Sequence, residues 1–277
     1  LNLFKFFIFN NLKMQCVFPD SSALKRIIAT VGQGIELVNL IFTPTGFNVS
    51  SIDGSKTNLV EINLDASYFT TYSCTQDTKI GIHVGPLLNL MRHVGAKDTV
   101  QWTLAKPDGN DKISILVANT DDKVKTMTQY DMRLIDIEED SLEVPTLTYD
   151  AIVRVSSAFF RSWHQKTSIT KNNVTFNATG NRFEVIAESE EWGKVTIQQP
   201  MPSAGAISVK TCPQMSSTTI NNNAMALVDT MVQCTPGVDI SFKEGMPLAV
   251  VGYFDKDKKS SISVFLAPIM SDMMDDD

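Results

Sequence analysis

The sequence contains few of the residues from which catalytic and metal sites are most often built. Its 277 residues include three histidines and four cysteines, and no two cysteines form a CxxC pair. This spacing argues against a zinc site and favours a reduced, intracellular protein with inert thiols. The G-x-S-x-G, Walker, G-x-G-x-x-G and HExxH motifs are also missing. We therefore predict no catalytic residues, no metal site and no cofactor.

Long uninterrupted apolar runs are scarce as well. The opening segment, residues 1–13, resembles a signal peptide, but Lys5 interrupts its apolar run and no small-residue cleavage site follows. No other stretch approaches the length of a membrane span. We expect Met14 to begin the folded domain and residues 1–13 to form a disordered extension.

Positive charge is in deficit, with 24 basic against 31 acidic residues and a formal net charge of −7. This balance argues against a general nucleic-acid binder, although it permits a local basic face. The acidic run that contains Asp136, Glu138 and Glu139 leaves a divalent-metal nuclease open as an alternative. Such a site needs carboxylates that converge from different elements, so a solvated connector is the favoured interpretation.

The most informative pattern is one layout that occurs twice, at an offset of about 135 to 140 residues. In each copy a helical run is followed by a hairpin, further alternating strands and a second helical run. The first copy comprises residues 23–28, 39–53 and 86–95, and the second comprises 158–163, 173–187 and 225–233. Such a duplication predicts pseudo-symmetry, and it favours an assembled scaffold over a single catalytic cleft.

Periodicity predicts the architecture of each half. Apolar residues at i, i+3, i+4 and i+7 predict short helices, and a period of two between them predicts strands. We therefore expect an α+β fold in which each half is an antiparallel sheet covered on one face by two short helices. The predicted boundaries are 14–131 for the first domain, 132–150 for a connector, 151–270 for the second domain and 271–277 for an acidic tail.

Basic residues and one histidine occupy the polar side of three of the four predicted helices. They are Lys25 and Arg26, Arg92, and Arg161, His164 and Lys166. Charges on exposed helix faces are common, but duplicated helices on one sheet face would present theirs to a common side. That arrangement suits sequence-independent contact with phosphates. The fourth helix offers Asp229 instead.

Four segments in consistent order carry a resemblance to a known family. They are SIDGSKTNLVEINLDASYFTTYSC (51–74), QYDMRLIDIEEDSLEVP (129–145), PLAVVGYF (247–254) and VFLAP (264–268). With them the chain resembles the proliferating cell nuclear antigen family of DNA sliding clamps over roughly residues 14–270.

The resemblance implies a non-catalytic processivity factor. It would form a homotrimeric ring of six similar domains, with helices around a hole that duplex DNA threads. The clamp would tether DNA polymerase and other replication and repair proteins, would be opened by a clamp loader, and would act in the nucleus or at a viral replication site. Residues 123–130 of one subunit would pair with 193–199 of the next. The alternative is a checkpoint-type or viral accessory clamp that is not a homotrimer.

The family also implies two sets of binding residues. A pocket for short apolar and aromatic peptide motifs would be lined by Ile52, Leu142, Val144, Pro145, Pro247, Phe265, Ala267 and Pro268. The basic helix residues named above would face DNA. His164 stands where a basic residue is usual in the family, and Asn89 and Gln233 stand where lysines are expected. We therefore hypothesise a weaker hold on DNA than that of its relatives.

Overall fold

The computed structural model describes residues 12–105, 111–119, 126–138, 147–200, 207–212 and 214–269. In the first half of the chain these residues form β1 Leu12–Val17, α1 Ser21–Val31, β2 Leu37–Thr43, β3 Gly46–Ile52, β4 Asn58–Asp65, η2 Ala66–Tyr68, β5 Thr71–Cys74, β6 Thr78–His83, α2 Val84–Arg92, β7 Thr99–Ala105, β8 Lys112–Ala118 and β9 Met127–Arg133. The second half forms β10 Ala151–Ser156, α3 Ser157–Thr167, η3 Ser168–Thr170, β11 Asn173–Thr179, β12 Arg182–Ser189, β13 Gly193–Pro200, β14 Ile207–Thr211, β15 Ser216–Asn221, η4 Asn222–Ala224, α4 Met225–Val232, β16 Gly237–Phe242, β17 Leu248–Tyr253 and β18 Ser261–Leu266.

The duplication seen in the sequence is present in the topology. The strand runs of the first half are β5-β1-β7-β8-β9 and β4-β3-β2-β6, and those of the second half are β14-β10-β16-β17-β18 and β13-β12-β11-β15. Adding nine to each strand number converts the first set into the second. The helices also fall at the same points in both halves, after the first and sixth strands. The predicted α+β fold of antiparallel strands and short helices is confirmed.

The chain forms two compact units. The first comprises Leu1–Ser51 and Ile62–Asp140, and the second comprises Ile52–Glu61 and Ser141–Asp277. The end of β3 and the start of β4 therefore group with the second half. The domain limits proposed from the sequence, with a connector at 132–150, stay a prediction.

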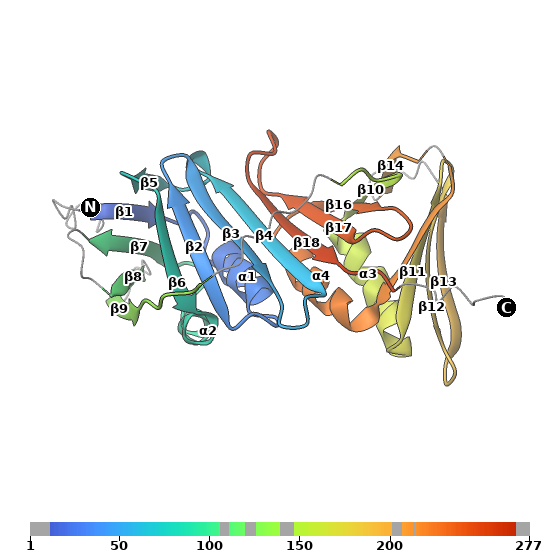
Figure 1. Ribbon diagram of the computed structural model, residues 1–277, viewed down its shortest axis with the longest axis horizontal. Coiled ribbons are helices and arrows are strands. Elements are labelled where there is room, and N and C mark those ends of the chain that lie inside the picture. The colour runs from blue at the N-terminus through green and yellow to red at the C-terminus, as the bar shows by residue number, and fades with distance from the viewer. Residues whose placement is uncertain are drawn as a thin grey trace. The chain divides into compact units, whose positions relative to one another are not determined.

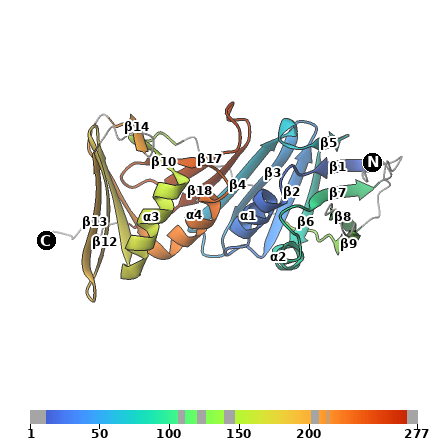
Figure 2. The same cartoon turned by 180° about the vertical axis from the view of Figure 1, so that it is seen from behind.

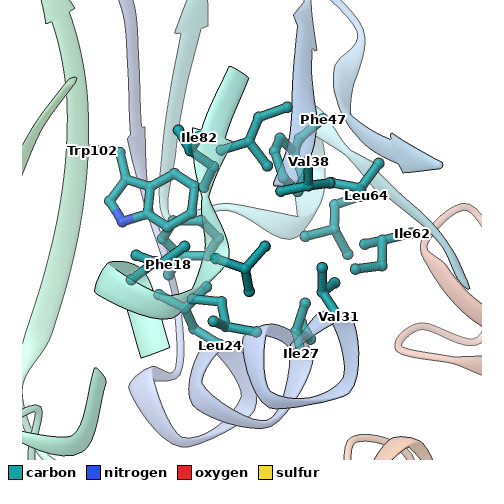
Figure 3. A pocket seen from close by; sticks show the side chains of 15 residues that line it. Phe18, Leu24, Ile27, Val31, Val38, Phe47, Ile62, Leu64, Ile82 and Trp102 are labelled. Carbon is teal, nitrogen blue, oxygen red and sulfur yellow. The ribbon is translucent and has the colours of Figure 1, made fainter. Parts of the chain in front are cut away.

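Within each unit two helices pack beside one another against the strands (Figures 1 and 2). In the first unit Leu24, Ile27 and Val31 of α1 point toward side chains of the strands, and Trp102 closes one side (Figure 3). The space that remains among these side chains is about 30 Å³ and its lining is apolar. A void of that size and lining is a packing defect of the core and no ligand site.

A hydroxyl hydrogen bond joins the two helices of each unit in the same way. Ser21, the first residue of α1, donates to the carbonyl oxygen of Gly95 at 2.8 Å. Ser157, the first residue of α3, donates to the carbonyl oxygen of Thr235 at 2.5 Å. Each acceptor lies three residues beyond the end of the unit's second helix. The duplication therefore extends from strand order to individual hydrogen bonds.

The structure departs from the sequence-based boundaries at both ends of the first domain. Strand β1 begins at Leu12, which pairs with Ala105, and the carbonyl oxygen of Lys13 accepts a hydrogen bond from the backbone N–H of Thr75. These two residues are strand and not disordered extension, because the ladder to β7 continues past Met14. Met132 and Arg133, expected in the connector, belong to β9.

Some predictions fall on residues that the structure does not describe. They concern residues 1–11 of the extension, residues 139–146 of the connector and the acidic tail at 271–277. Among the described helices, none is long and apolar enough to cross a membrane.

Candidate nucleic-acid interface and partner pocket

The helix pair of the first unit carries three of the predicted DNA-facing residues. The Lys25 side chain is half-buried and its Nζ donates to the carbonyl oxygen of Val94 at 3.1 Å, which ties α1 to the end of α2. Arg26 is exposed on α1, and Arg92 is exposed in the last turn of α2, where a cation is favoured by the helix dipole. Two of the three side chains are therefore exposed to solvent.

The helix pair of the second unit places an acid among its cations. Asp229 of α4 lies with its Oδ1 3.7 Å from Nε of Arg161 and 3.5 Å from Nδ1 of His164, both on α3. Gln233, one turn further along α4, donates its Nε2 to the backbone carbonyl of Asp229 at 3.1 Å. Lys166 is exposed on α3, and no ion pair of this residue occurs in the described part of the chain. The net positive charge of this face is therefore much reduced.

The residues predicted for the partner pocket come from three places in the second unit. Ile52 ends β3, Pro247 precedes β17, and Phe265, Ala267 and Pro268 lie in and after β18. Ala267 is exposed and the other four are half-buried. Leu142, Val144 and Pro145 of the predicted set fall outside the described residues.

A backbone hydrogen bond brings two of these segments together. The N–H of Ala267 donates to the carbonyl oxygen of Thr57 at 2.8 Å, so the segment after β18 lies beside the loop between β3 and β4. Ile269, which is 39% exposed, continues this segment and donates its N–H to the carbonyl oxygen of Thr219. The sequence prediction did not include Ile269, although its place next to Pro268 in an apolar segment was a usable signal.

The loop beside Ala267 is shaped by the buried carboxylate of Asp53. Its Oδ1 accepts the backbone N–H groups of Thr57 and Asn58 at 2.8 and 3.0 Å, and its Oδ2 accepts Ser55 Oγ at 2.6 Å and Asn58 Nδ2 at 2.8 Å. Burial raises the pKa of Asp53, but these hydrogen bonds outweigh it and hold the pKa below its ordinary value. The sequence prediction missed Asp53, although the run Asp-Gly-Ser-Lys-Thr is a turn signature.

Six strands end their sheets in the described part of the chain, namely β5, β9, β14, β6, β13 and β15, and two of these, β9 and β13, bear on the predicted subunit contact. Strand β9 has β8 as its neighbour, and β13 has β12. Their side chains alternate between exposed and half-buried over most of their length. Of the predicted subunit contact, residues 126–130 and 193–199 fall on or beside these strands, whereas 123–125 lie outside the described residues. Free edges of this kind can accept a strand from another chain.

The described residues contain no group of three or more histidine, cysteine, aspartate or glutamate side chains placed to hold a metal ion. The part of the acidic run at 136–138 that is described lies outside strands and helices.

Comparison with known proteins identifies the family to which this fold corresponds. Residues 13–142 match the family model described as "Proliferating cell nuclear antigen, N-terminal domain". The chain is 24% identical over 254 residues to the proliferating cell nuclear antigen of Dictyostelium discoideum, covering 90% of this chain and 96% of that one. It is 25% identical to the "Probable DNA polymerase sliding clamp 2" of Paramecium bursaria Chlorella virus 1, covering 96% and 95% of the two chains. The chain belongs to the sliding clamp family of proliferating cell nuclear antigen.

A solved structure supports the same fold. Proliferating cellular nuclear antigen from Entamoeba histolytica superposes with a TM-score of 0.82 at 18% identity, covering 94% of this chain and 100% of that chain. The family resemblance predicted from four sequence segments is thus confirmed. Because the sliding clamp family is non-catalytic, the chain is a clamp and not an enzyme, as the sequence predicted. The nuclease alternative is set aside on the ground of family.

Proposed function

We propose that this sliding clamp is a DNA polymerase processivity factor that encircles duplex DNA as a homotrimeric ring. The observation that carries the proposal is that β9 in one unit and β13 in the other, the strands of the predicted subunit contact, are both edge strands. Because the two edges are different strands, a joint between them is head-to-tail, and head-to-tail joints close into rings when the rotation allows. The duplicated fold supplies two similar domains per chain, hence six per trimer.

The proposed DNA contact is made by the exposed cations of the helix pairs. Arg26 and Arg92 of the first unit and Lys166 of the second offer charge without a specific base-reading geometry, which suits phosphate contact that does not depend on sequence. Lys25 contributes less because it is half-buried and bonded to Val94, and Arg161 and His164 contribute less because they lie beside the carboxylate of Asp229. This distribution supports the proposal that the clamp slides with a weak grip.

The proposed docking site for clients is the apolar surface around the β3–β4 loop and the segment after β18. Ile52, Phe265, Ala267 and Pro268 would receive a short apolar and aromatic motif, with Leu142, Val144 and Pro145 completing the wall. The Asp53 hydrogen bonds fix the loop before any peptide arrives, which lowers the entropy cost of binding. DNA polymerase, repair proteins and a clamp loader are the proposed partners, in the nucleus or at a viral replication site.

A clamp that is not a homotrimer is the second candidate. Two relatives are named probable DNA polymerase sliding clamps of Paramecium bursaria Chlorella virus 1. The match to one of them covers 96% of the present chain. A viral accessory clamp or a checkpoint-type subunit is consistent with that likeness.

Sedimentation velocity tests the ring and separates the two candidates. The homotrimer predicts three times the 30.6 kDa mass of one chain. Retention on nicked circular plasmid, with release after the plasmid is cut once, is the expected behaviour of a ring that slides. A protein that stays monomeric at all concentrations, or that binds linear and circular DNA equally, contradicts the proposal.

A further inference from the structure

The side chain of Trp192 is unusually exposed for a tryptophan. Its exposed fraction is 60%, whereas Trp102 and Trp163 are 2% and 1% exposed in the cores of their units. It lies in the turn between β12 and β13, where its backbone N–H donates to Ser189 Oγ at 3.1 Å. Gly193 follows with φ at +70°, a conformation that suits glycine. The turn is therefore fixed by local contacts, and it presents the indole to solvent.

The position of this turn points to the kind of partner that covers the indole. Trp192 leads directly into β13, an edge strand on which Val195 and Ile197 are half-buried. The edge strand β9, which is its partner in the ring proposed above, likewise carries half-buried apolar side chains at Tyr130 and Met132. Both strands thus have a half-apolar face, so a second copy of the chain is the occupant that fits the edge.

The charges next to the two edges favour one direction of pairing. Glu190 and Glu191 precede Trp192, and both are exposed. At the C-terminal end of β9, Lys112 is already bound to Asp131 at 2.6 Å, whereas Arg133 is exposed and makes no ion pair among the described residues.

Antiparallel pairing of β13 with β9 brings the acidic turn to the Arg133 end. Parallel pairing would bring it to Met127 and Thr128 at the other end of β9, which carry no charge. Attraction between the glutamates and the guanidinium therefore selects the antiparallel direction.

We propose that Trp192 of one copy packs on the guanidinium of Arg133 of the next copy, with Glu190 and Glu191 around it, and that this contact anchors each joint of the ring. An arginine over an indole face is a favourable cation–π arrangement, and a tryptophan near arginine is typical of interface hot spots. The proposal rests on the ring proposed above and names the side chains that determine how tightly it closes.

The test uses the full chain and its intrinsic fluorescence. Trp192→Ala and Arg133→Ala are each expected to raise the concentration of half-assembly by about tenfold or more in sedimentation experiments. Met215→Ala is the matched control, because Met215 is 70% exposed and precedes β15, which lies at the other end of the sheet from β13. On dilution of the wild type, the emission of Trp192 is expected to shift to the red, and this shift is expected to be missing in Trp192→Phe.

The outcomes separate this inference from the ring itself. If the wild type assembles and neither substitution changes its assembly, the Trp192–Arg133 contact is wrong while the ring stands. If the double variant is weakened by the sum of the two single effects, the two residues act separately and the proposed contact is also wrong. If the wild type never assembles, the proposed ring fails, and this inference fails with it.

Discussion

The imidazole Nδ1 of His164 lies 3.5 Å from Oδ1 of Asp229, so α3 and α4 are bridged on the face proposed to meet DNA. Arg161 contacts the same oxygen at 3.7 Å. A phosphate that approaches Arg161 must compete with this carboxylate and also meets its repulsion. The side chain of Asp229 therefore reduces the hold on DNA in two ways, by occupying Arg161 and by adding negative charge.

Replacing Asp229→Asn is expected to strengthen retention on circular DNA and to make its salt dependence steeper. Release of Arg161 for phosphate contact adds up to about one unit to the slope of log affinity against log salt concentration. Asp150→Asn is the matched control, since it makes the same charge change beside Lys243, 3.5 Å away. Equal gains from both variants would mean that overall charge alone is responsible.

The two serine hydroxyls that join the helix pairs are expected to stabilise their units independently. Ser21→Ala and Ser157→Ala should each lower the free energy of unfolding by about 1 kcal/mol, because each removes a hydroxyl donor from a backbone carbonyl. Ser22→Ala serves as the control, since no side-chain hydrogen bond of Ser22 is described. Denaturant titration measures the loss. A double variant that loses clearly more than the sum contradicts the independence of the two sites.

The Asp53 loop is expected to confer a specific acid sensitivity. Because the pKa of Asp53 is lowered in the folded chain, its stabilising effect is complete above the unfolded pKa of about 4 and is lost as the pH falls through the lower folded value. Asp53→Asn should cost about 1 to 3 kcal/mol at neutral pH, because an amide NH₂ would face the Nδ2 donor of Asn58.

The same substitution probes the pocket. A synthetic peptide with an apolar and aromatic motif should bind Asp53→Asn more weakly than the wild type in isothermal titration calorimetry.

The acid sensitivity is measured separately. In scanning calorimetry, the melting temperature should differ less between pH 7 and pH 3 for the variant than for the wild type. An unchanged difference between the two pH values would refute the assigned role of this carboxylate.

The core below α1 is expected to tolerate little loss of volume. Leu24 is 2% exposed and borders the existing void of about 30 Å³, so Leu24→Ala enlarges a cavity that the neighbouring side chains already fail to fill. A loss of about 2 to 5 kcal/mol in unfolding free energy is expected. Leu37→Ala, at a position that is 43% exposed, should change stability by less than about 0.5 kcal/mol. Chemical denaturation followed by circular dichroism distinguishes the two.

Periodicity in the sequence was sufficient for the architecture. The stripe Leu24, Ile27, Ile28 and Val31 predicts a helix on a sheet, and these four residues are buried on α1. The repeat predicted a fold built twice, and strand order confirms it. Such patterns are readable because burial of one face repeats along a helix or strand with a fixed period.

Contacts between elements could not be predicted from the sequence in the same way. Nothing in the local sequence of α3 indicates that Arg161 and His164 meet Asp229, which lies more than sixty residues away. The participation of Lys25 in a bond to Val94 is equally hidden, because it depends on how α1 and α2 pack. The start of β1 at Leu12 was missed because it depends on pairing with β7, which the residues of β1 alone do not indicate.

In the proposed ring, the unlike edges β9 and β13 would make every joint head-to-tail, which mixing experiments can exploit. A chain damaged on β9 and a chain damaged on β13 each keep one sound edge, and these two edges are complementary. Neither chain would close a ring alone, yet an equimolar mixture would form a heterodimer with a single sound joint. Assembly would stop there, because the two outer ends of that dimer are both damaged. Because the proposed joint is head-to-tail, ring closure can be blocked after the first two subunits have associated.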